Sequence, residues 1–346
     1  MRDVLRVDDL HVRFAAPGRF IQAVRGVSFR IRPASTVALV GESGSGKSVV
    51  SQSIMRILPR NGEITRGAIL FTDPRGEGEP VDLSRLPADG PAMRSIRGGQ
   101  ISIIFQEPMS SLSPLHTIGD QVSEALRQHR NETAGEAREL TVDMLRLVGF
   151  PDPGRAWRSY PFELSGGLRQ RAMIAMALSC DPELLIADEP TTALDVTIQA
   201  QILDLMRSLQ ERLKMSILLI THDLGVVAET CEEVAVMYAG QVVERAKVRD
   251  LFRSPQMPYT EGLLNSIPRL GMTQDERLAV IEGTVPNPLR WPAGCRFAPR
   301  CRYRFDKCDQ PPPLFPVEGQ LARCWLVEEG RRTVKVPGAT AAEGSA

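Results

Sequence analysis

The 346-residue chain has no net charge and no long apolar run. Its 42 basic residues balance its 42 acidic residues, so no global field draws the protein to nucleic acid or to an anionic membrane. The longest apolar stretches, such as 215–220, fall far short of the roughly 20 residues that a bilayer span requires. The N-terminus also lacks the basic stretch and apolar run of a secretory signal. We therefore expect a cytosolic chain that does not cross a membrane by itself.

Cysteine is scarce, with six residues in the chain, but four of them lie between positions 295 and 324. Cytosolic thiols stay reduced, so this group favours metal binding over disulfide bonds. Five, six and fifteen residues separate successive members, and none forms the C-x2-C spacing typical of structural zinc. Four thiolates could still hold an iron–sulfur cluster or zinc. The group consists of Cys295, Cys301, Cys308 and Cys324.

A glycine-rich octapeptide directly follows the apolar run 37–40 and is the strongest chemical signal in the sequence. It spells a Walker A phosphate loop, Gly41-Glu42-Ser43-Gly44-Ser45-Gly46-Lys47-Ser48. Its glycines let the backbone curl so that consecutive N–H groups and a helix N-terminus face the β-phosphate. Lys47 then bridges the β- and γ-phosphates, and the Ser48 hydroxyl binds Mg²⁺. The motif predicts a nucleoside triphosphate as the ligand.

A second motif, Leu184-Leu185-Ile186-Ala187-Asp188-Glu189-Pro190, is an apolar strand that ends in two carboxylates. Ligands of parallel sheets bind at the carboxyl ends of the strands, so this is the form of a Walker B strand. We expect Asp188 to hold Mg²⁺ through water and Glu189 to polarise the attacking water as a general base.

A third motif separates the chain from generic nucleotide hydrolases. It reads Leu164-Ser165-Gly166-Gly167-Leu168-Arg169-Gln170-Arg171 and precedes an apolar helix at 172–178. Ser165 and the amides of Gly166 and Gly167 form a second anion-binding helix start that has no phosphate in its own chain. In its sequence and in its distance before the Walker B strand, the motif resembles the signature of the ATP-binding cassette (ABC) ATPases.

The resemblance covers about residues 4 to 250 and assigns four further positions. Gln106 resembles the Q-loop glutamine, which senses Mg²⁺ and the attacking water. Asp195, in Ala193-Leu194-Asp195, resembles the D-loop residue at the dimer interface, and His222 resembles the switch histidine that contacts the γ-phosphate. Phe14 is the candidate for the aromatic ring that stacks on adenine, with Phe20 as the alternative.

The resemblance implies an α/β fold of the P-loop NTPase class, with a RecA-like core, an antiparallel β subdomain and a helical subdomain. Strand patterns at 5–14, 24–31, 37–40, 101–105, 184–187 and 217–220, and a hairpin at 234–244, agree with it. We place the ATPase domain at 1–250, with the helical insertion at about 107–163. Residues 251–346 form a small, irregular, Cys-rich extension whose ending, 337–346, we expect to be disordered.

The extension narrows the resemblance further. Its segments 258–268, 283–286 and 294–301 are similar to the C-terminal extension of peptide-type and nickel-type importer ATPases. An apolar residue at the fifth place of the signature, here Leu168, is similar to the signature of dipeptide and oligopeptide importer ATPases. This resemblance favours a [4Fe-4S] cluster on the four cysteines, with zinc as the alternative.

A peptide importer ATPase implies partners. They are a second ATPase subunit, forming a heterodimer whose signature closes over this chain's ATP, two membrane permease subunits and an extracytoplasmic solute-binding protein. The chain is then a peripheral protein on the cytoplasmic face of the membrane. Nickel and haem remain open as cargo. A soluble cassette ATPase that acts on DNA or ribosomes is the alternative class, but the zero net charge and the lack of a basic and aromatic stripe speak against it.

Overall fold

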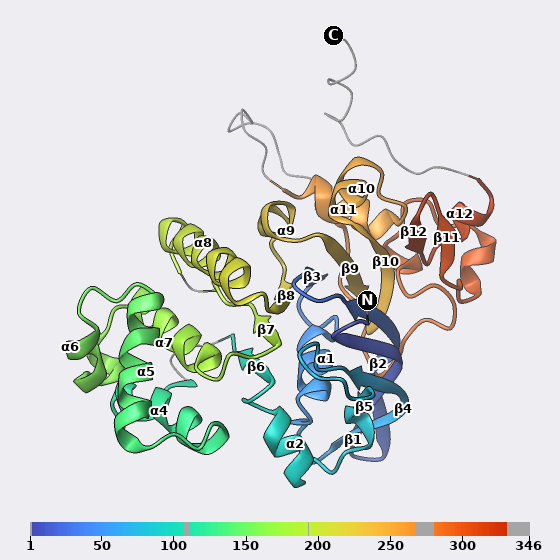
Figure 1. The fold of residues 1–346 in the computed structure, drawn as a ribbon. Helices are drawn as coiled ribbons and strands as arrows, with labels where there is room; N and C mark the ends of the chain where they lie inside the picture. The colour runs from blue at the N-terminus through green and yellow to red at the C-terminus, as the bar shows by residue number, and fades with distance from the viewer. Residues whose placement is uncertain (1, 107–110, 193, 268–279, 331–346) are drawn as a thin grey trace.

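A computed structural model describes residues 2–106, 111–192, 194–267 and 280–330 of the chain. Within these ranges two β-sheets form the frame of the protein (Figure 1). One is antiparallel, in the order β2-β1-β4-β5, and the other is mixed, in the order β11-β12-β10-β9-β3-β8-β7-β6. The strands are β1 (Leu5–Ala16), β2 (Arg19–Ile31), β3 (Thr36–Val40), β4 (Gly62–Phe71), β5 (Val81–Asp82), β6 (Ile101–Ile104), β7 (Leu184–Asp188), β8 (Ser216–Thr221), β9 (Glu233–Tyr238), β10 (Gln241–Lys247), β11 (Phe315–Val317) and β12 (Gln320–Ala322).

Helices cover both faces of the mixed sheet. The α-helices are α1 (Lys47–Ile54), α2 (Pro91–Ile96), α4 (Ile118–His129), α5 (Ala134–Leu147), α6 (Pro153–Arg158), α7 (Gly166–Leu178), α8 (Val196–Leu213), α9 (Leu224–Thr230), α10 (Val248–Arg253), α11 (Pro258–Asn265) and α12 (Trp325–Glu328). Short 3-10 turns span Leu83–Arg85, Pro161–Glu163, Ala298–Arg300 and Asp306–Asp309. In the described part of the chain, no helix has the length and apolar character needed to cross a bilayer.

The centre of the mixed sheet brings the predicted motifs to one edge. Strand β3 lies between β8 and β9 and is parallel to both, and β6, β7 and β8 continue the parallel order. Every residue of β3, β7 and β8 is buried, which explains their nearly continuous apolar sequence. Val40 pairs with Thr221, and Asp188 pairs with Ile220. The residues that follow these strands therefore meet at the carboxyl edge, where ligands of parallel sheets bind.

The antiparallel sheet packs its apolar face against α1 and the mixed sheet. Buried side chains of β1 and β2, such as Val7 and Phe29, share one core with Ile54 of α1 and Leu39 of β3. The sequence analysis did not predict β4 and β5. Most of the first half of β4 is exposed or half-buried, so its apolar pattern is weak and only its end, Ile69 to Phe71, reads as a strand.

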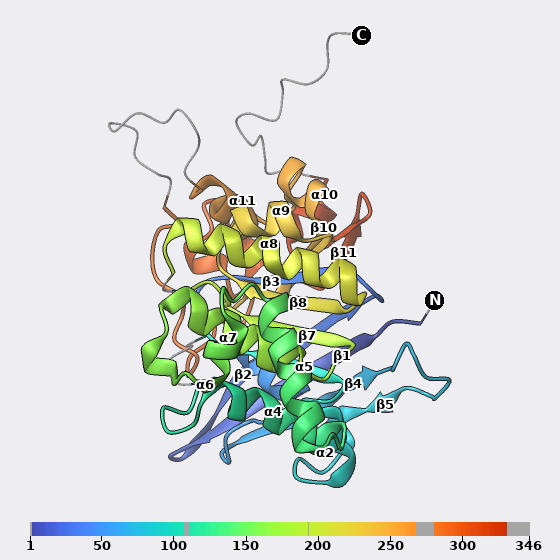
Figure 2. The same ribbon diagram turned by 60° about the vertical axis from the view of Figure 1, so that its left-hand side comes forward.

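Helices α4, α5 and α6 form a separate layer with α7, on the left in Figure 1. Two capping boxes start this layer's long helices, Thr117 with Asp120 for α4 and Thr133 with Glu136 for α5. Their buried faces share a core with α7, α8 and strands β7 and β8, and α8 runs along that face of the sheet (Figure 2). Helices α4, α5 and α6 fall within the range 107–163 predicted as a helical insertion, and α7 follows it. Residues 107–110 of that range lie outside the described part.

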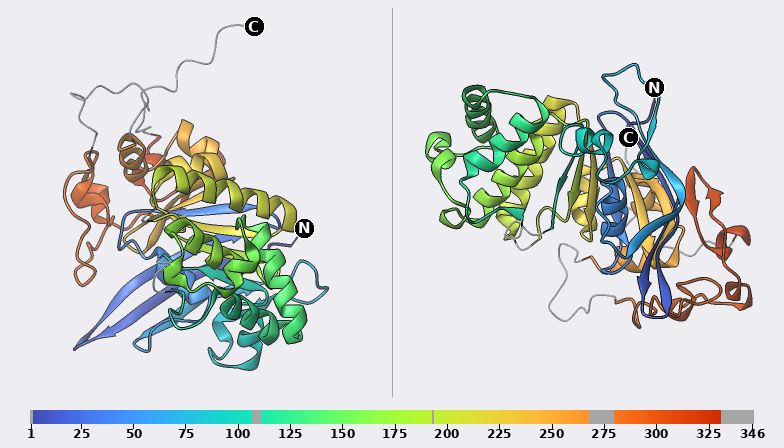
Figure 3. Two further views of the ribbon diagram at one scale, coloured as in Figure 1. Left: turned by 90° about the vertical axis from the view of Figure 1, so that its left-hand side faces the viewer. Right: turned by 90° about the horizontal axis from the view of Figure 1, so that it is seen from below.

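The C-terminal extension is joined to the ATPase core and is more regular than the sequence analysis predicted. Strand β12 pairs with β10 in the register Glu244 to Ala322, so the β11–β12 hairpin lengthens the mixed sheet. Seen from below, the extension lies on the opposite side of the sheets from the helical layer (Figure 3). The hairpin strands have only three residues each, too few for a periodic signal. The predicted disordered ending, 337–346, lies outside the described residues.

Candidate functional site

The Walker A loop, residues 41–48, connects β3 to α1 through a backbone that only glycine can follow. Gly41 has φ 152°, and a Cβ atom on it would lie 2.2 Å from the carbonyl oxygen of Met237 in β9. Gly46 has φ 100°, and its Cβ would lie 2.9 Å from the carbonyl oxygen of Ala23 in β2. The loop is thus held between β9 of the mixed sheet and β2 of the antiparallel sheet.

Lys47 is buried at the start of α1, with 5% of the residue exposed. Its Nζ donates hydrogen bonds to the carbonyl oxygens of Gly41, at 2.7 Å, and Glu42, at 3.2 Å. Burial lowers the pKa of Lys47, while the nearby carboxylates of Glu189, Asp188 and Glu42 oppose this shift. The ammonium group is therefore held by the loop's own carbonyls and lies among acidic groups, as a phosphate-binding lysine requires.

Asp188, the last residue of β7, lies beside the start of α1. Burial raises its pKa, and hydrogen bonds from the Ser48 and Ser51 hydroxyls counter that effect. Ser51 Oγ donates to Asp188 Oδ2 at 3.2 Å, while Oδ1 is buried and has no hydrogen-bond partner among the described residues. A buried carboxylate oxygen without a partner, next to the Ser48 hydroxyl, is the oxygen donor set that Mg²⁺ prefers. The residues present fit the predicted Mg²⁺.

Gln106, Glu189 and His222 come from three different strand ends and meet at one carboxylate. Gln106 Nε2 donates to Glu189 Oε2 at 2.8 Å, and His222 Nδ1 lies 3.4 Å from Glu189 Oε1. The backbone N–H of Glu189 donates to Ile220 O at 2.8 Å, with φ 48° at Glu189. Thr192 Oγ1 adds a hydrogen bond to Glu189 Oε2 at 3.0 Å. The structure thus brings together the three residues predicted to be catalytic.

The signature residues lie at a different helix start. Ser165 is the N-cap of α7 and accepts a hydrogen bond from Leu168 N, and Asp195 caps α8 in the same way through Ile198 N. A Cβ atom on Gly167 would lie 3.1 Å from Ile198 Cγ2, so the two helix starts are neighbours. Ser165 and Gly166 are exposed. Among the described residues, no hydrogen bond or ion pair joins residues 165–167 to residues 41–48.

The two candidate aromatic residues differ in exposure. Phe14 is half-buried and packs against the core, and its ring stands 2.6 Å from where a Cβ atom on Gly62 would lie. Phe20 is 57% exposed, and the guanidinium carbon of Arg13 lies 4.0 Å from the centre of its ring. The alternative, Phe20, is therefore the ring with an open surface, and Phe14 is held by packing.

The four cysteines of the extension gather in one apolar cluster. Cys295, Cys308 and Cys324 are buried and Cys301 is half-buried. Burial raises the pKa of Cys301 to about 11 and of Cys324 to about 12, with a further rise from the charges of the other thiols. In the described part of the chain, however, no group of three or more His, Cys, Asp or Glu side chains is placed to hold a metal ion. The structure thus places the four thiols in one cluster but not in the ligand arrangement of a [4Fe-4S] or zinc site.

Several residues at the site were not singled out from the sequence. Thr192 follows Glu189 by three residues and Ser51 follows Ser48 by three, and in both cases the structure places the hydroxyl on a predicted acidic residue. The i, i+3 spacing on a helix was the available signal for Ser51. The contact of Glu42 with Arg300, 258 positions away, had no local signal.

Comparisons with known proteins agree with this geometry. The family described as "ABC transporter" matches residues 24–192, and the one described as "Oligopeptide/dipeptide transporter, C-terminal region" matches residues 243–308. A dipeptide transport ATP-binding protein of Bacillus subtilis is 50% identical over 95% of this chain and 96% of its own length. An oligopeptide transport ATP-binding protein of the same organism is 51% identical over 95% of this chain and 98% of its own length.

Solved structures show the same fold. A dimeric ATP-binding cassette in a post-hydrolysis state, bound to ADP and Pi, has a TM-score of 0.61. It is 26% identical and covers 71% of this chain and 99% of that chain. This similarity confirms the predicted P-loop fold, and the ABC transporter match agrees with the ATPase prediction. The chain belongs to the ATP-binding proteins of the dipeptide and oligopeptide ABC transporter family.

Proposed function

We propose that this chain is the ATP-hydrolysing subunit that powers the uptake of dipeptides or oligopeptides through partner permeases. The observation that carries the proposal is the meeting of Gln106, Glu189 and His222 beside the Walker A loop, in a chain whose relatives are named dipeptide and oligopeptide transport ATP-binding proteins. The match of the extension to the oligopeptide/dipeptide C-terminal region supports peptides as the cargo.

Hydrolysis follows from the positions of these side chains. The Walker A amides and Lys47 bind and orient the phosphates, and Glu189 accepts a proton from the attacking water at Oε1 or Oε2. Gln106 and Thr192 fix the Oε2 side of that carboxylate, and His222 stands at Oε1. Mg²⁺ would be held by Ser48 and Asp188, with Gln106 nearby, and neutralises charge on the phosphates when bound. Positioning and electrostatics carry the catalysis, with no covalent intermediate.

The exposed signature residues support a dimer in which each chain completes the other's site. Ser165 and Gly166 face solvent at the start of α7, where unpaired N–H groups favour an anion. The solved cassette named above is a dimer bound to ADP and Pi. We infer a second ATPase subunit, a paralogue in a heterodimer, two permease subunits and an extracytoplasmic binding protein as partners. The chain then works at the cytoplasmic face of the membrane as a peripheral subunit.

The test is to co-purify the chain with its permease, second ATPase and binding protein and to measure phosphate release in proteoliposomes. We expect peptide-loaded binding protein to raise the rate, and Glu189→Gln in this chain to lower it. Nickel or haem as the only stimulating cargo would overturn the peptide assignment and leave the ATPase. Stimulation by RNA or ribosomes without membrane partners would favour the soluble alternative instead.

The [4Fe-4S] cluster, with zinc as the alternative, stays a prediction. The gathering of Cys295, Cys301, Cys308 and Cys324 in one buried cluster supports it, and the lack of a metal-binding arrangement in the described residues counts against it. Anaerobic purification with iron, sulfide and zinc analysis decides. About four irons and four sulfides per chain would establish the cluster, and a chain that is metal-free after anaerobic purification would remove it.

A further inference from the structure

The segment 295–301 of the extension contacts the Walker A loop directly through Arg300 and indirectly, by way of the β9–β10 turn, through Arg296. We propose that its arginines, above all Arg300, are positioning residues that hold the loop in its phosphate-binding shape. We call this segment the arginine clamp. The inference takes ATP as the ligand of the loop, and the clamp itself touches only the protein.

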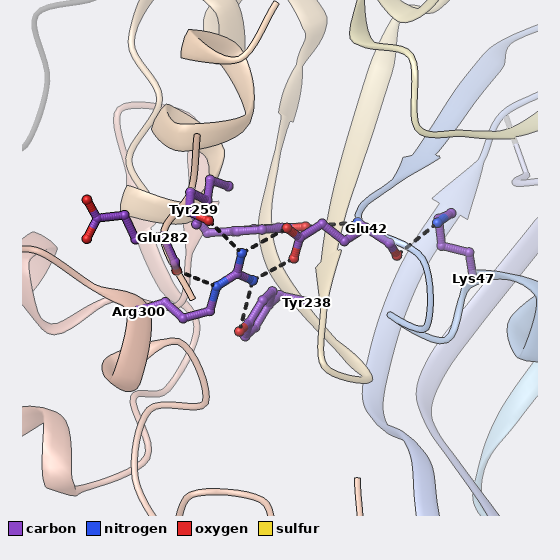
Figure 4. A network of polar contacts seen from close by, with 7 residues as sticks. Glu42, Lys47, Tyr238, Tyr259, Glu282 and Arg300 are labelled. Atoms are coloured by element: carbon purple, nitrogen blue, oxygen red, sulfur yellow. Dashed lines mark hydrogen bonds and ion pairs between the residues drawn. The ribbon is translucent and has the colours of Figure 1, made fainter. Parts of the chain in front are cut away.

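Glu42, the second residue of the Walker A loop, is held through three separate groups (Figure 4). Its carboxylate accepts two hydrogen bonds from Arg300, Nη1 to Oε2 at 2.7 Å and Nη2 to Oε1 at 3.0 Å. Its backbone N–H donates to Tyr259 Oη at 2.9 Å, and its carbonyl accepts from Lys47 Nζ at 3.2 Å. Glu42, the second residue after the end of β3, is thus fixed by the extension, by α11 and by the phosphate-binding lysine.

Arg300 is itself fixed and cannot follow a moving loop. Only 4% of its side chain is exposed, and its Nε donates to Glu282 O at 3.0 Å. Its Nη2 also donates to Ile281 O at 3.2 Å, and its guanidinium carbon lies 5.8 Å from the centre of the Tyr238 ring. A planar guanidinium with two parallel bonds to a carboxylate sets distance and orientation together. The bidentate pair therefore determines where Glu42 can lie.

The second contact reaches the other end of the loop through the β9–β10 turn. Arg296 Nη1 donates to the carbonyl oxygen of Ala239 in that turn, and the guanidinium carbon lies 4.7 Å from the centre of the Trp291 ring. The next residue, Gly240, donates its N–H to Ser45 O at 2.9 Å. Arg296 is 5% exposed, so this contact is also part of the packed interior.

The clamp acts before the nucleotide arrives. A glycine-rich loop without outside contacts has many conformations, and ATP would have to order it on binding. With Glu42 held by Arg300 and Ser45 held through the β9–β10 turn, part of that ordering is already done, so losing the clamp should weaken ATP binding while the chemistry at Glu189 stays the same. This gives the extension a part in the ATPase that does not depend on a metal at its cysteines.

The experiment compares Arg300→Gln with Arg304→Gln, using a fluorescent ATP analogue for Kd on the full chain and phosphate release by the transporter assembled with its partners for KM and kcat. Arg304 lies in the same extension, is 53% exposed and pairs with Asp309, away from the loop. We expect a rise of about tenfold in Kd and KM for Arg300→Gln with kcat unchanged at saturating ATP, and less than a twofold change for Arg304→Gln. Arg300→Lys, which keeps the charge and loses the two parallel bonds, should fall between them.

Glu42→Gln tests the same contact from the loop side, because it keeps the shape of the side chain and removes the charge. The double variant Glu42→Gln with Arg300→Gln should bind ATP no more weakly than the worse single variant. Equal Kd values for Arg300→Gln and Arg304→Gln, or additive losses in the double variant, would overturn the clamp. If Arg300→Gln fails to fold, Glu42→Gln decides alone, and an unchanged Kd overturns it. A wild-type chain that binds no ATP would refute the nucleotide assignment itself, and with it the clamp.

Discussion

The Walker A loop and the signature loop both contain glycines at helix starts and are both predicted to bind an anion, but their contacts within the chain differ. Gly41 and Gly46 lie against the carbonyls of Met237 and Ala23, and Glu42 is bonded to two distant parts of the protein. At the signature, Ser165 and Gly166 are exposed, and among the described residues a Cβ on Gly166 would meet only Leu194, at 3.7 Å.

This difference indicates that one half of the ATP site is complete within the chain. The Walker A loop is shaped by its own core and is ready for phosphates, together with Asp188 and Glu189. The signature has its helix start and its cap but no ligand from the same chain, because among the described residues nothing ties it to residues 41–48. This difference supports the proposal that the signature acts on a nucleotide bound by another subunit.

The largest effect is expected at Glu189, beside the Walker A loop. Glu189→Gln removes the general base and should lower the rate of phosphate release by about 10²- to 10⁴-fold, with ATP still bound. The matched control is Glu211→Gln in α8, which makes the same change at an exposed residue. If Glu189→Gln hydrolyses ATP at the wild-type rate, another group carries the base function.

Two glycines of the Walker A loop test how tightly it is held. Gly41→Ala puts a methyl group 2.2 Å from the Met237 carbonyl, so we expect a loss of stability above about 3 kcal/mol and no ATP binding. Gly44→Ala, at φ 77° with no atom of the described residues within 4 Å of the new Cβ, should cost only about 1 kcal/mol from the left-handed backbone. Thermal unfolding and nucleotide binding measure both. Similar losses for the two variants would contradict the close packing of the loop.

The free energy of unfolding should depend on pH through a buried carboxyl group of the mixed sheet, which carries the Walker A loop. Glu244 in β10 accepts hydrogen bonds from Gln256 N and Met257 N, and burial raises its pKa from 4.5 to about 7. The folded state therefore keeps this proton between pH 4.5 and 7, where the unfolded chain has lost it. Its contribution to stability is complete below pH 4.5 and falls by about 3 kcal/mol as the pH rises through 7.

Urea unfolding of wild type and Glu244→Gln at several pH values checks this dependence. The difference in unfolding free energy between the two proteins should decline from pH 4.5 to pH 7, because the amide does not titrate. A constant difference across that range would mean that Glu244 ionises normally in the folded protein.

The smallest effect is expected at the signature. Ser165→Ala removes the cap of α7 and should lower stability by about 1 kcal/mol, since one helix N–H loses its partner. ATP binding to the isolated chain should not change. A clear loss of ATP affinity in this variant would break the distinction between the two halves.

The sequence predicted the parts of the site that depend on local spacing. The Walker A loop, Asp188 and Glu189 lie at the ends of apolar strands, and parallel strand ends meet at one edge, so their approach could be inferred before the structure. The contacts of Gln106 and His222 with Glu189 needed the family resemblance as well. The fold was predictable to the same extent, except for β4, whose residues are mostly exposed or half-buried, the two-residue strand β5 and the short β11–β12 hairpin.

Contacts between distant segments could not be predicted. The Glu42–Arg300 pair joins positions 258 residues apart, and no periodic pattern carries that information. For the four cysteines, the sequence indicated their proximity but not their geometry. Their grouping in the sequence correctly indicated that they gather in space, but ligand geometry depends on the direction of each thiol, which spacing alone does not set.

The most direct test of the central claim is ATP binding by the isolated chain, compared between Lys47→Ala and Gly166→Asp. Asp is well suited to the first turn of α7, so the second variant should fold while placing a negative charge on the signature. Our account predicts that Lys47→Ala weakens ATP binding by about 100-fold or more and that Gly166→Asp binds like wild type. Equal loss of binding in both variants would show that the signature contacts ATP within its own chain, and would contradict the account.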